Sequence, residues 1–297
     1  MPIRKISWWK SLTFLIVHFL ALGVFFFPFD WKWVALCVGS YYLRMFAITA
    51  GYHRYFSHRS YEMNRISQFF MALLGTTSVQ KGVLWWAANH RHHHKYSDQP
   101  NDIHSPLQHG FWWSHMGWIM ATEHEPTQWT LIKDFERYPE LRWLNRYYFI
   151  PQFLYALGMY LAWGMPGLFW GFFLSTTLLW HGTFTINSLS HVFGSQRYVT
   201  SDTSKNNFWL SLLTLGEGWH NNHHTYMSSA RQGFFWWEID ISYTILTLLS
   251  RVGVVKNLRS PPLKNLEARL ISRQNNIALE RPAIANSNNQ LLNKRPA

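Results

Sequence analysis

Residues 147–186 read YYFIPQFLYALGMYLAWGMPGLFWGFFLSTTLLWHGTFTI and contain no Asp, Glu, Lys or Arg. Two apolar runs, 147–163 and 166–186, lie on either side of the turn Gly164-Met165-Pro166. As a helix, each run is long enough to cross a hydrocarbon core of about 30 Å. Because the connection is so short, we expect an antiparallel helical hairpin with both ends on the same side of a membrane.

The N-terminal part of the chain shows the same pattern. Residues 11–29 are almost wholly apolar apart from His18, and a turn around Pro28 and Asp30 leads to a second apolar run, 31–50. Charged residues make up only 14% of the chain, whereas soluble domains have about 25%. The sequence therefore predicts an all-α integral membrane protein with four transmembrane helices in two hairpins and a substantial water-facing part.

The distribution of positive charge predicts the orientation of these hairpins. The chain before the first apolar run carries Arg4, Lys5 and Lys10, whereas the two tight turns carry only Lys32 and Asp30. Cytoplasmic segments are enriched in Lys and Arg. We therefore expect the N-terminus, the region 53–146 and the C-terminal third of the chain in the cytoplasm, where the water-facing part would form a helical cap. The first apolar run lacks the small-residue pattern of a cleavable signal.

The C-terminal part differs in composition from the rest of the chain. From Arg251 onward there are nine Lys or Arg and two Asp or Glu. We interpret residues 1–255 as one membrane domain and 256–297 as a basic, partly disordered tail. Its partner would be the anionic cytoplasmic lipid surface rather than nucleic acid. A tail that is simply solvated is the alternative interpretation.

Histidine is concentrated in three short stretches, which hold nine of the 16 histidines. The stretches are His53 and His58; His90, His92, His93 and His94; and His220, His223 and His224. Histidines at i, i+3 and i+4 share one face of a helix, and imidazole is the commonest metal ligand. Two such triplets and a pair provide more nitrogen ligands than one tetrahedral zinc ion can bind. Since Cys37 is the only cysteine, the pattern predicts a two-metal site with histidine and oxygen ligands.

The spacing H-x4-H, H-x2-H-H and H-x2-H-H resembles that of the membrane fatty acyl desaturases, specifically the Δ9 stearoyl-CoA desaturase-like group. Three further motifs add to the resemblance: Ile48-Thr49-Ala50-Gly51, Gly216-Glu217-Gly218-Trp219 and Asn187-Ser188-Leu189-Ser190-His191. The resemblance covers residues 41–243. It implies an O₂-dependent enzyme that introduces a cis double bond, at Δ9, into a saturated acyl chain. A membrane hydroxylase with the same metal centre is the alternative function, and a metal transporter is a third.

The resemblance also implies the ligands of two iron ions, where spacing alone would not exclude zinc or copper. One ion would be held by His53, His58, His90, His94 and His223, and the other by His93, His191, His220 and His224, with Asn187 reaching it through a water. His92 has no counterpart among the ligands, and His181 would be structural. Ligating histidines usually donate their second N–H to an acceptor, so we expect this role for Asp98, Asp102 and Glu217.

The acyl chain is expected to bend in a tunnel beside the metals. Gln80, Trp86 and Thr183 match positions that shape the bend, while Tyr41 and Met45 face the expected closed end. We predict that the bulk of Met45 shortens the tunnel and favours acyl chains of 16 carbons or fewer.

The acyl carrier and the electron donor stay open. Animal acyl-CoA desaturases have an Arg-Asp pair where this chain has Ala88-Asn89, so acyl-CoA, acyl-carrier protein and an intact lipid are all possible carriers. No fused electron-carrier segment is visible, so electrons would come from a separate protein such as a ferredoxin or a cytochrome b5-type protein. With no ER-retrieval signal, a bacterial inner membrane is the expected location.

Overall fold

The computed structural model describes residues 6–9 and 11–271, and this part of the chain is predominantly helical. Its one sheet pairs β1 (Glu62–Met63) with β2 (Val255–Lys256) in antiparallel register. The basic residues Arg4, Lys5 and Lys10, on which the predicted orientation depends, lie outside the described residues. So does the tail from residue 272 onward.

The long helices carry the apolar runs. Helix α1 (Leu12–Ala21) continues as a 3-10 helix, Leu22–Phe26, and α2 (Trp31–Phe46) continues as a π-helix, Ala47–Ser57. Helix α9 (Phe149–Pro166) continues through the π-helix Gly167–Leu174 into α10 (Ser175–Asn187). Within the described residues, Trp31–Ser57 and Phe149–His191 are long and apolar enough to cross a membrane, and Leu12–Phe26 is shorter.

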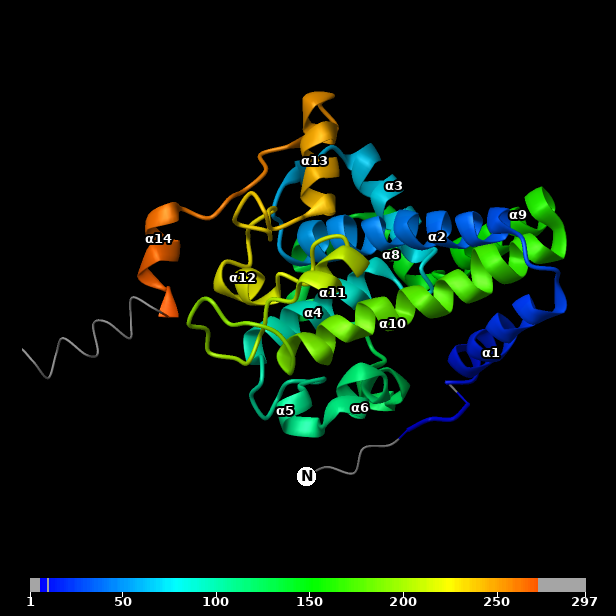
Figure 1. Ribbon diagram of the computed structural model, residues 1–297, viewed down its shortest axis with the longest axis horizontal. Helices are drawn as coiled ribbons and strands as arrows, with labels where there is room; N and C mark the ends of the chain where they lie inside the picture. The colour runs from blue at the N-terminus through cyan, green and yellow to red at the C-terminus, as the bar shows by residue number, and fades with distance from the viewer. Residues whose placement is uncertain (1–5, 10, 272–297) are drawn as a thin grey trace, which may run out of the picture.

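Gly164 divides the longer of these runs into two arms. Its backbone has φ 63° and ψ −156°, a conformation that glycine adopts without the steric cost that a Cβ would add. The chain reverses there, and the turn after α1 lies at the same end of the molecule (Figure 1). At that second turn, the side chain of Asp30 accepts a hydrogen bond from the Lys32 N–H and caps α2.

The second apolar helix differs from the expectation at its end. We expected it to stop at residue 50, where polar side chains begin, but the π-helix carries it on to Ser57. All residues of this extension are buried. The polar side chains of this extension lie in the interior of the cap. The change from apolar to polar residues after residue 50 therefore does not coincide with the end of the helix.

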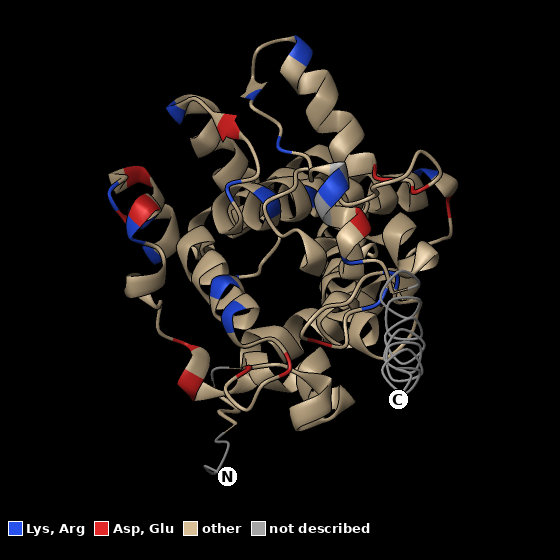
Figure 2. Ribbon diagram, turned by 90° about the vertical axis from the view of Figure 1, so that its left-hand side faces the viewer, with Lys and Arg blue, Asp and Glu red and all other residues tan. Residues whose placement is uncertain are grey.

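The cap, residues 58–146 and 188–271, surrounds the other end of the long helices. Its helices are α3 (Arg65–Thr76), α4 (Val83–Tyr96), α5 (Pro106–His109), α6 (Phe111–His115), α7 (Lys133–Glu136), α8 (Pro139–Arg146), α11 (Phe208–Leu213), α12 (His220–Thr225), α13 (Ile241–Arg251) and α14 (Leu263–Ala268). Figure 2 views the molecule from this end and shows charged residues on several sides of the cap.

The first part of the expected tail is attached to the cap. Beyond β2, the N–H of Arg259 donates to the Ser60 carbonyl, and the guanidinium of Arg269 donates to the Thr225 carbonyl. The N–H of Ile271 donates to the carbonyl of Arg197. Residues 256–271 therefore have defined positions against the body of the protein.

Two fully buried arginines connect the long helices to the cap. Arg44 on α2 donates to the Thr77 carbonyl and to the hydroxyl groups of Thr176 and Ser175. Arg54, on the π-helical extension, lies between the carboxylates of Glu217 and Asp240. Because an unpaired buried charge is costly, these contacts fix the position of α2 relative to the histidine-bearing segments.

Candidate metal centre

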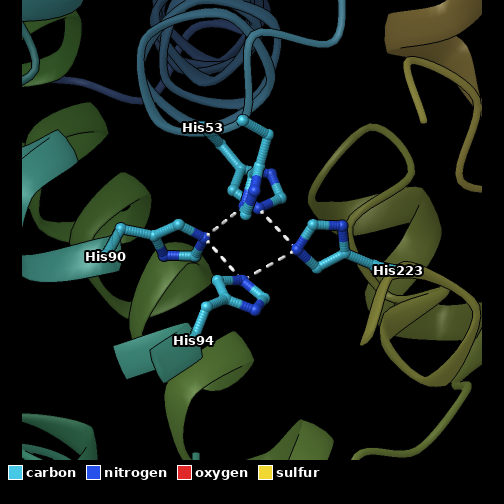
Figure 3. Close-up of side chains that lie close together, drawn as sticks. His53, His90, His94 and His223 are labelled. Atoms are coloured by element: carbon cyan, nitrogen blue, oxygen red, sulfur yellow. Dashed lines mark hydrogen bonds between the residues drawn. The ribbon is translucent and has the colours of Figure 1, made fainter. Parts of the chain in front are cut away.

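Five histidines from three separate segments form the first cluster. His53 and His58 come from the end of the α2 extension, His90 and His94 from α4, and His223 from α12. Figure 3 shows the rings of His53, His90, His94 and His223 turned toward one another. The Nε2 atoms in contact are 2.9–3.1 Å apart. Nitrogens from distant parts of the sequence thus converge on one point.

The π-helix explains how the first histidine pair takes part. His53 and His58 are five residues apart, and in an α-helix of 3.6 residues per turn this spacing would place them on different faces. In the structure the N–H of His58 donates to the carbonyl of His53 at 3.2 Å, which is the i to i+5 pattern of a π-helix. The wider turn brings both rings to the cluster, where their centroids lie 4.8 Å apart.

The second cluster consists of His93, His191, His220 and His224, all of which are buried. The Nε2 atoms of His191 and His220 are 3.1 Å apart. Each histidine triplet is therefore shared between the clusters: α4 gives two rings to the first and one to the second, and α12 does the reverse. The two sets are those that the resemblance implied, and their role as metal ligands stays a prediction.

Four carboxylates face the outer nitrogens of the clusters. Glu217 Oε2 lies 2.6 Å from His53 Nδ1, Asp102 Oδ2 lies 3.0 Å from His93 Nδ1, and Asp98 Oδ2 lies 3.2 Å from His191 Nδ1. Each of these three lies beside a cluster histidine, as expected. The fourth, Asp202, whose Oδ2 lies 2.6 Å from His224 Nδ1, was missed because no histidine stretch is near it in the sequence.

These carboxylates determine which nitrogen of each ring carries the proton. A carboxylate beside Nδ1 favours an N–H there, and a neutral ring then has its lone pair on Nε2. Burial tends to raise the pKa of the carboxyl groups of Asp98, Asp102 and Asp202, but the adjacent histidines and hydrogen bonds hold it well below its usual range. The four acceptors therefore stay ionised, and the lone pairs converge inside the clusters.

Burial also keeps the other imidazoles neutral. It lowers the pKa of five rings well below the ordinary value of 6.5, and the charge that neighbouring imidazoles would carry lowers it further. The five are His58, His90, His94, His220 and His223. Unprotonated imidazole is the form that binds metals, so the electrostatic environment suits a cation in both clusters.

The distances between the nitrogens also fit a bound cation. Two nitrogens bound at right angles to one ion, each at about 2.1 Å, are about 3.0 Å apart. The Nε2–Nε2 contacts in both clusters measure 2.9–3.1 Å. In the first cluster, His90 Nε2 and His223 Nε2 each contact two other Nε2 atoms, more than single N–H donors satisfy. The histidine clusters are thus suited to metal binding.

The remaining histidines near the site lie outside both clusters. His92 contacts the side chain of Gln128 and the carbonyl of Asn101, as its position off the shared face predicted. His181 on α10 contacts His18 and His115, so these three rings join α1, α6 and α10. His104 is one that the sequence interpretation missed: it is buried and its ring stacks on His93 with centroids 4.3 Å apart.

Three adjoining cavities lead past the first cluster. The outermost is bordered by Lys81, Trp85, Gln152 and Phe184, and the middle one by Trp86, His90 and Asn187. The innermost is bordered by Met45, Ile48, His53 and Thr183. Gln80 and Trp86 border both outer cavities, and Trp86, His90, Thr183 and Asn187 border both inner ones. The three cavities are therefore neighbours, and the two inner ones reach the first histidine cluster.

The residues expected at the bend of the acyl tunnel are hydrogen-bonded to each other. Trp86 Nε1 donates to Gln80 Oε1 at 3.1 Å, and Gln80 Nε2 donates to Thr183 Oγ1 at 3.0 Å. Trp86 also stacks on His90. Met45 borders the innermost cavity, whereas Tyr41 packs beside Gly182 and donates to the carbonyl of Leu213. Their roles toward substrate stay predictions.

Known proteins provide a comparison for this arrangement. A family model described as fatty acid desaturase matches residues 31–240. The sn-2 palmitoyl-lipid 9-desaturase of Nostoc sp. is 37% identical over 263 residues, which cover 87% of this chain and 92% of that protein. The sn-1 stearoyl-lipid 9-desaturase of Anabaena variabilis is 36% identical, with 86% and 94% covered. The acyl-CoA C20 Delta5-desaturase of Anemone leveillei is 34% identical, with 87% and 86% covered.

Proposed function

The chain belongs to the fatty acid desaturase family, and we propose that it introduces a cis double bond at Δ9 of a saturated long-chain acyl group in an O₂-dependent reaction. The observation that carries this proposal is that the two inner cavities are bordered by His53 and His90, which belong to the first of the two histidine clusters. The relatives named as 9-desaturases support the position of the double bond.

The metal centre would hold two iron ions, one in each cluster. His53, His58, His90, His94 and His223 would hold one, and His93, His191, His220 and His224 the other, with Asn187 reaching it through a water. Iron with O₂ supplies the strong oxidant that unactivated methylene groups require and that side chains lack. The chain itself orients four of the rings through its carboxylates. Burial keeps His58, His90, His94, His220 and His223 unprotonated.

The acyl chain would lie along the three cavities. The hydrogen-bonded group of Gln80, Trp86 and Thr183 gives the path a fixed polar corner beside His90. An otherwise apolar chain that passes this corner would turn there, which would present its middle methylenes to the metal centre. Met45 would close the far end and, with Tyr41 packed behind it, limit the length of chain beyond the double bond.

The proposed topology has four membrane crossings. The helical segments 12–26, 31–57, 149–163 and 166–187 would form two hairpins, with both turns on one side and the cap on the cytoplasmic side of a bacterial inner membrane. The broken helix at Gly164 and the common end of the two turns support this arrangement (Figure 1). Electrons would come from a separate ferredoxin or cytochrome b5-type protein, which the positive charge of the chain would attract if its surface is acidic.

The test is expression in cells that cannot make unsaturated fatty acids. We expect growth without added oleate, and mass mapping should place a double bond at C9. The variant His220→Ala should give no unsaturated product, because it removes a nitrogen from the second cluster. A hydroxylated acyl chain as the product would contradict desaturation and support the alternative chemistry.

A further inference from the structure

Three histidines outside both clusters are hydrogen-bonded in series. His18 on α1 contacts His181 on α10 with their Nε2 atoms 3.1 Å apart, and His181 Nδ1 lies 2.9 Å from Nε2 of His115 on α6. At the end of the series, His115 Nδ1 lies 2.9 Å from the hydroxyl oxygen of Ser188. His181 uses a different nitrogen for each neighbour. The three rings therefore form a line and do not converge on one point as metal ligands do.

One backbone carbonyl determines which nitrogens in this line carry a proton. His18 Nδ1 lies 2.7 Å from the carbonyl oxygen of Phe14, which only accepts, so the proton of His18 is on Nδ1. Burial lowers the pKa of His115 to about 4, and a neutral imidazole has one N–H and one lone pair. His18 Nε2 therefore accepts from His181 Nε2–H, and His181 Nδ1 accepts from His115 Nε2–H. His115 Nδ1 is left to accept from the hydroxyl of Ser188.

The series ends where α10 gives way to the segment that carries His191. Asn187 is the last residue of α10, and the 3-10 helix Leu189–His191 follows directly after Ser188. Carbonyls in the last turn of a helix have no partner within that helix. The carbonyl of Asn187 accepts from the hydroxyl of Ser114 on α6, 2.7 Å away. Ser114 and Ser188 are fully buried, so bulk water does not compete for these contacts.

Two consecutive residues of α6 thus hold two consecutive residues at the end of α10. Ser114 binds the carbonyl of Asn187, and His115 binds the hydroxyl of Ser188. Asn187 borders the two inner cavities, and the Nε2 of His191 lies 3.1 Å from the Nε2 of another ring in the second cluster. The two contacts from α6 therefore determine where the segment 187–191 lies relative to that cluster.

We propose that Ser114 and His115 are positioning residues for the metal centre, and that α1 fixes the tautomer of His115 through His181 and His18. With its proton on Nε2, the ring of His115 offers Nδ1 as the acceptor that holds Ser188 against α6. Helix α1 contributes to the metal centre in this way although none of the expected ligands lies on it. The proposal rests on the proposed function, because it concerns the ion that His191 and, through a water, Asn187 would hold.

NMR spectra of the full-length protein with ¹⁵N-labelled histidine test the tautomers independently of activity. Zinc in place of iron keeps the protein diamagnetic, and single histidine variants assign the signals. We expect the proton on Nδ1 in His18 and on Nε2 in His181 and His115. A His115 ring with its proton on Nδ1 in the wild type would overturn the proposal.

The variant His18→Phe tests the role of α1. It removes the acceptor for His181 Nε2–H, so either tautomer of His181 then leaves one nitrogen unpaired and neither is favoured. We expect both tautomers at His181 and at His115. Phe19→Leu is the matched control, since Phe19 is the next residue on α1 and is exposed, and it should keep one tautomer. A single, unchanged tautomer of His115 in His18→Phe would overturn the role of α1.

Mössbauer spectra of the ⁵⁷Fe-loaded protein test the positioning role at the metal centre. His115→Leu removes the acceptor for Ser188, whereas His115→Asn keeps one, because Asn Oδ1 and His Nδ1 are the same number of bonds from Cβ. We expect His115→Leu to change the signal of one ion at unchanged iron content, and His115→Asn to restore it. Trp112→Phe is the control, since Trp112 is exposed on the same helix. A wild-type spectrum for His115→Leu would overturn the positioning role.

Turnover separates failure of this proposal from failure of the proposed function. We expect kcat to fall on the order of tenfold in His115→Leu, the effect of one lost hydrogen bond, and to recover in His115→Asn. A changed signal of one ion without any desaturated product would contradict only the proposed function. Desaturation with the wild-type kcat in His115→Leu would contradict only the positioning role. Loss of iron from both ions in His115→Leu and His115→Asn alike would show general destabilisation and would also overturn that role.

Discussion

The Nδ1 atom of His53 lies 2.6 Å from Oε2 of Glu217, although the two residues are 164 positions apart in the chain. The contact ties the extension of α2 to the loop before α12 and turns the Nε2 of His53 toward His223 Nε2, 3.1 Å away. Burial would raise the pKa of the Glu217 carboxyl, but His53 and Arg54 lower it. The same carboxylate–histidine relationship recurs at Asp98, Asp102 and Asp202.

Asp202→Asn should weaken metal binding in the second cluster. The amide cannot supply the negative charge that favours the proton on His224 Nδ1, 2.6 Å from the present carboxylate oxygen. Loss of such an outer partner typically costs roughly 10–100-fold in metal affinity. Iron content after timed exposure to a chelator measures the effect. Glu140→Gln is the control, since Glu140 is ion-paired with the exposed Arg65, and its iron content should equal that of the wild type. Equal iron retention in both variants would contradict the role of Asp202.

His94→Ala and His92→Ala should differ, although the two residues are two positions apart on one helix. His94 belongs to the first cluster, where its Nε2 contacts His90 and His223, so its removal should abolish activity and reduce the iron content. His92 instead contacts Gln128, Asn101 and the ring of Tyr96, so His92→Ala should retain its iron. Iron per polypeptide and the yield of unsaturated product measure both effects. Loss of iron in His92→Ala would show that the clusters are assigned incorrectly.

Met45→Ala should change the preferred chain length. Met45 borders the innermost cavity and is almost fully buried, so a smaller side chain would lengthen the path. We expect the preference to shift toward chains of 18 carbons or more, measured by competition among saturated substrates of different length. Leu43→Ala is the control on the same helix, because Leu43 is exposed. The idea that Met45 closes the tunnel fails if both variants keep the wild-type preference.

Acidification should destabilise the metal-free protein. Burial, followed by repulsion from neighbouring imidazoles, lowers the pKa of His58, His90, His94, His220 and His223 below 6.5 in the folded state. As the pH falls through 6.5, the unfolded chain therefore takes up protons that the folded chain does not. Each such ring therefore lowers the free energy of unfolding by about 1.4 kcal/mol per pH unit below 6.5. Burial would lower the pKa of His93, but Asp102 raises it above 6.5. Protonation of His93 therefore stabilises the folded state as the pH falls.

The melting temperature of the metal-free protein tests this expectation. The pKa of His104 and His224 is lowered as well. Because these rings and the five above outweigh the effect of His93, the melting temperature should fall as the pH is lowered from 7.5 to 5.5. Extraction of iron by a chelator should become faster over the same range, since protons compete with the metal for the nitrogens. A melting temperature that is constant or rises on acidification would contradict the electrostatic description of the clusters.

Much of the fold follows from short-range patterns that a sequence displays directly. The apolar runs around Gly164 and Asp30 predict long helices and tight turns, because helix length and turn chemistry depend on neighbouring residues. The end of the α2 extension was not predictable in this way. Its polar residues are buried against parts of the chain that lie more than 150 residues away. Arg54, for example, pairs with Glu217 and Asp240.

The sequence by itself determined that His90, His93 and His94, and likewise His220, His223 and His224, share a helix face, since the period of an α-helix is a local property. Only the tertiary structure decided how each triplet is divided between the two clusters, how a π-helix brings His53 beside His58, and that Asp202 faces His224. These features depend on contacts between residues far apart in the chain, and helix periodicity carries no information about them.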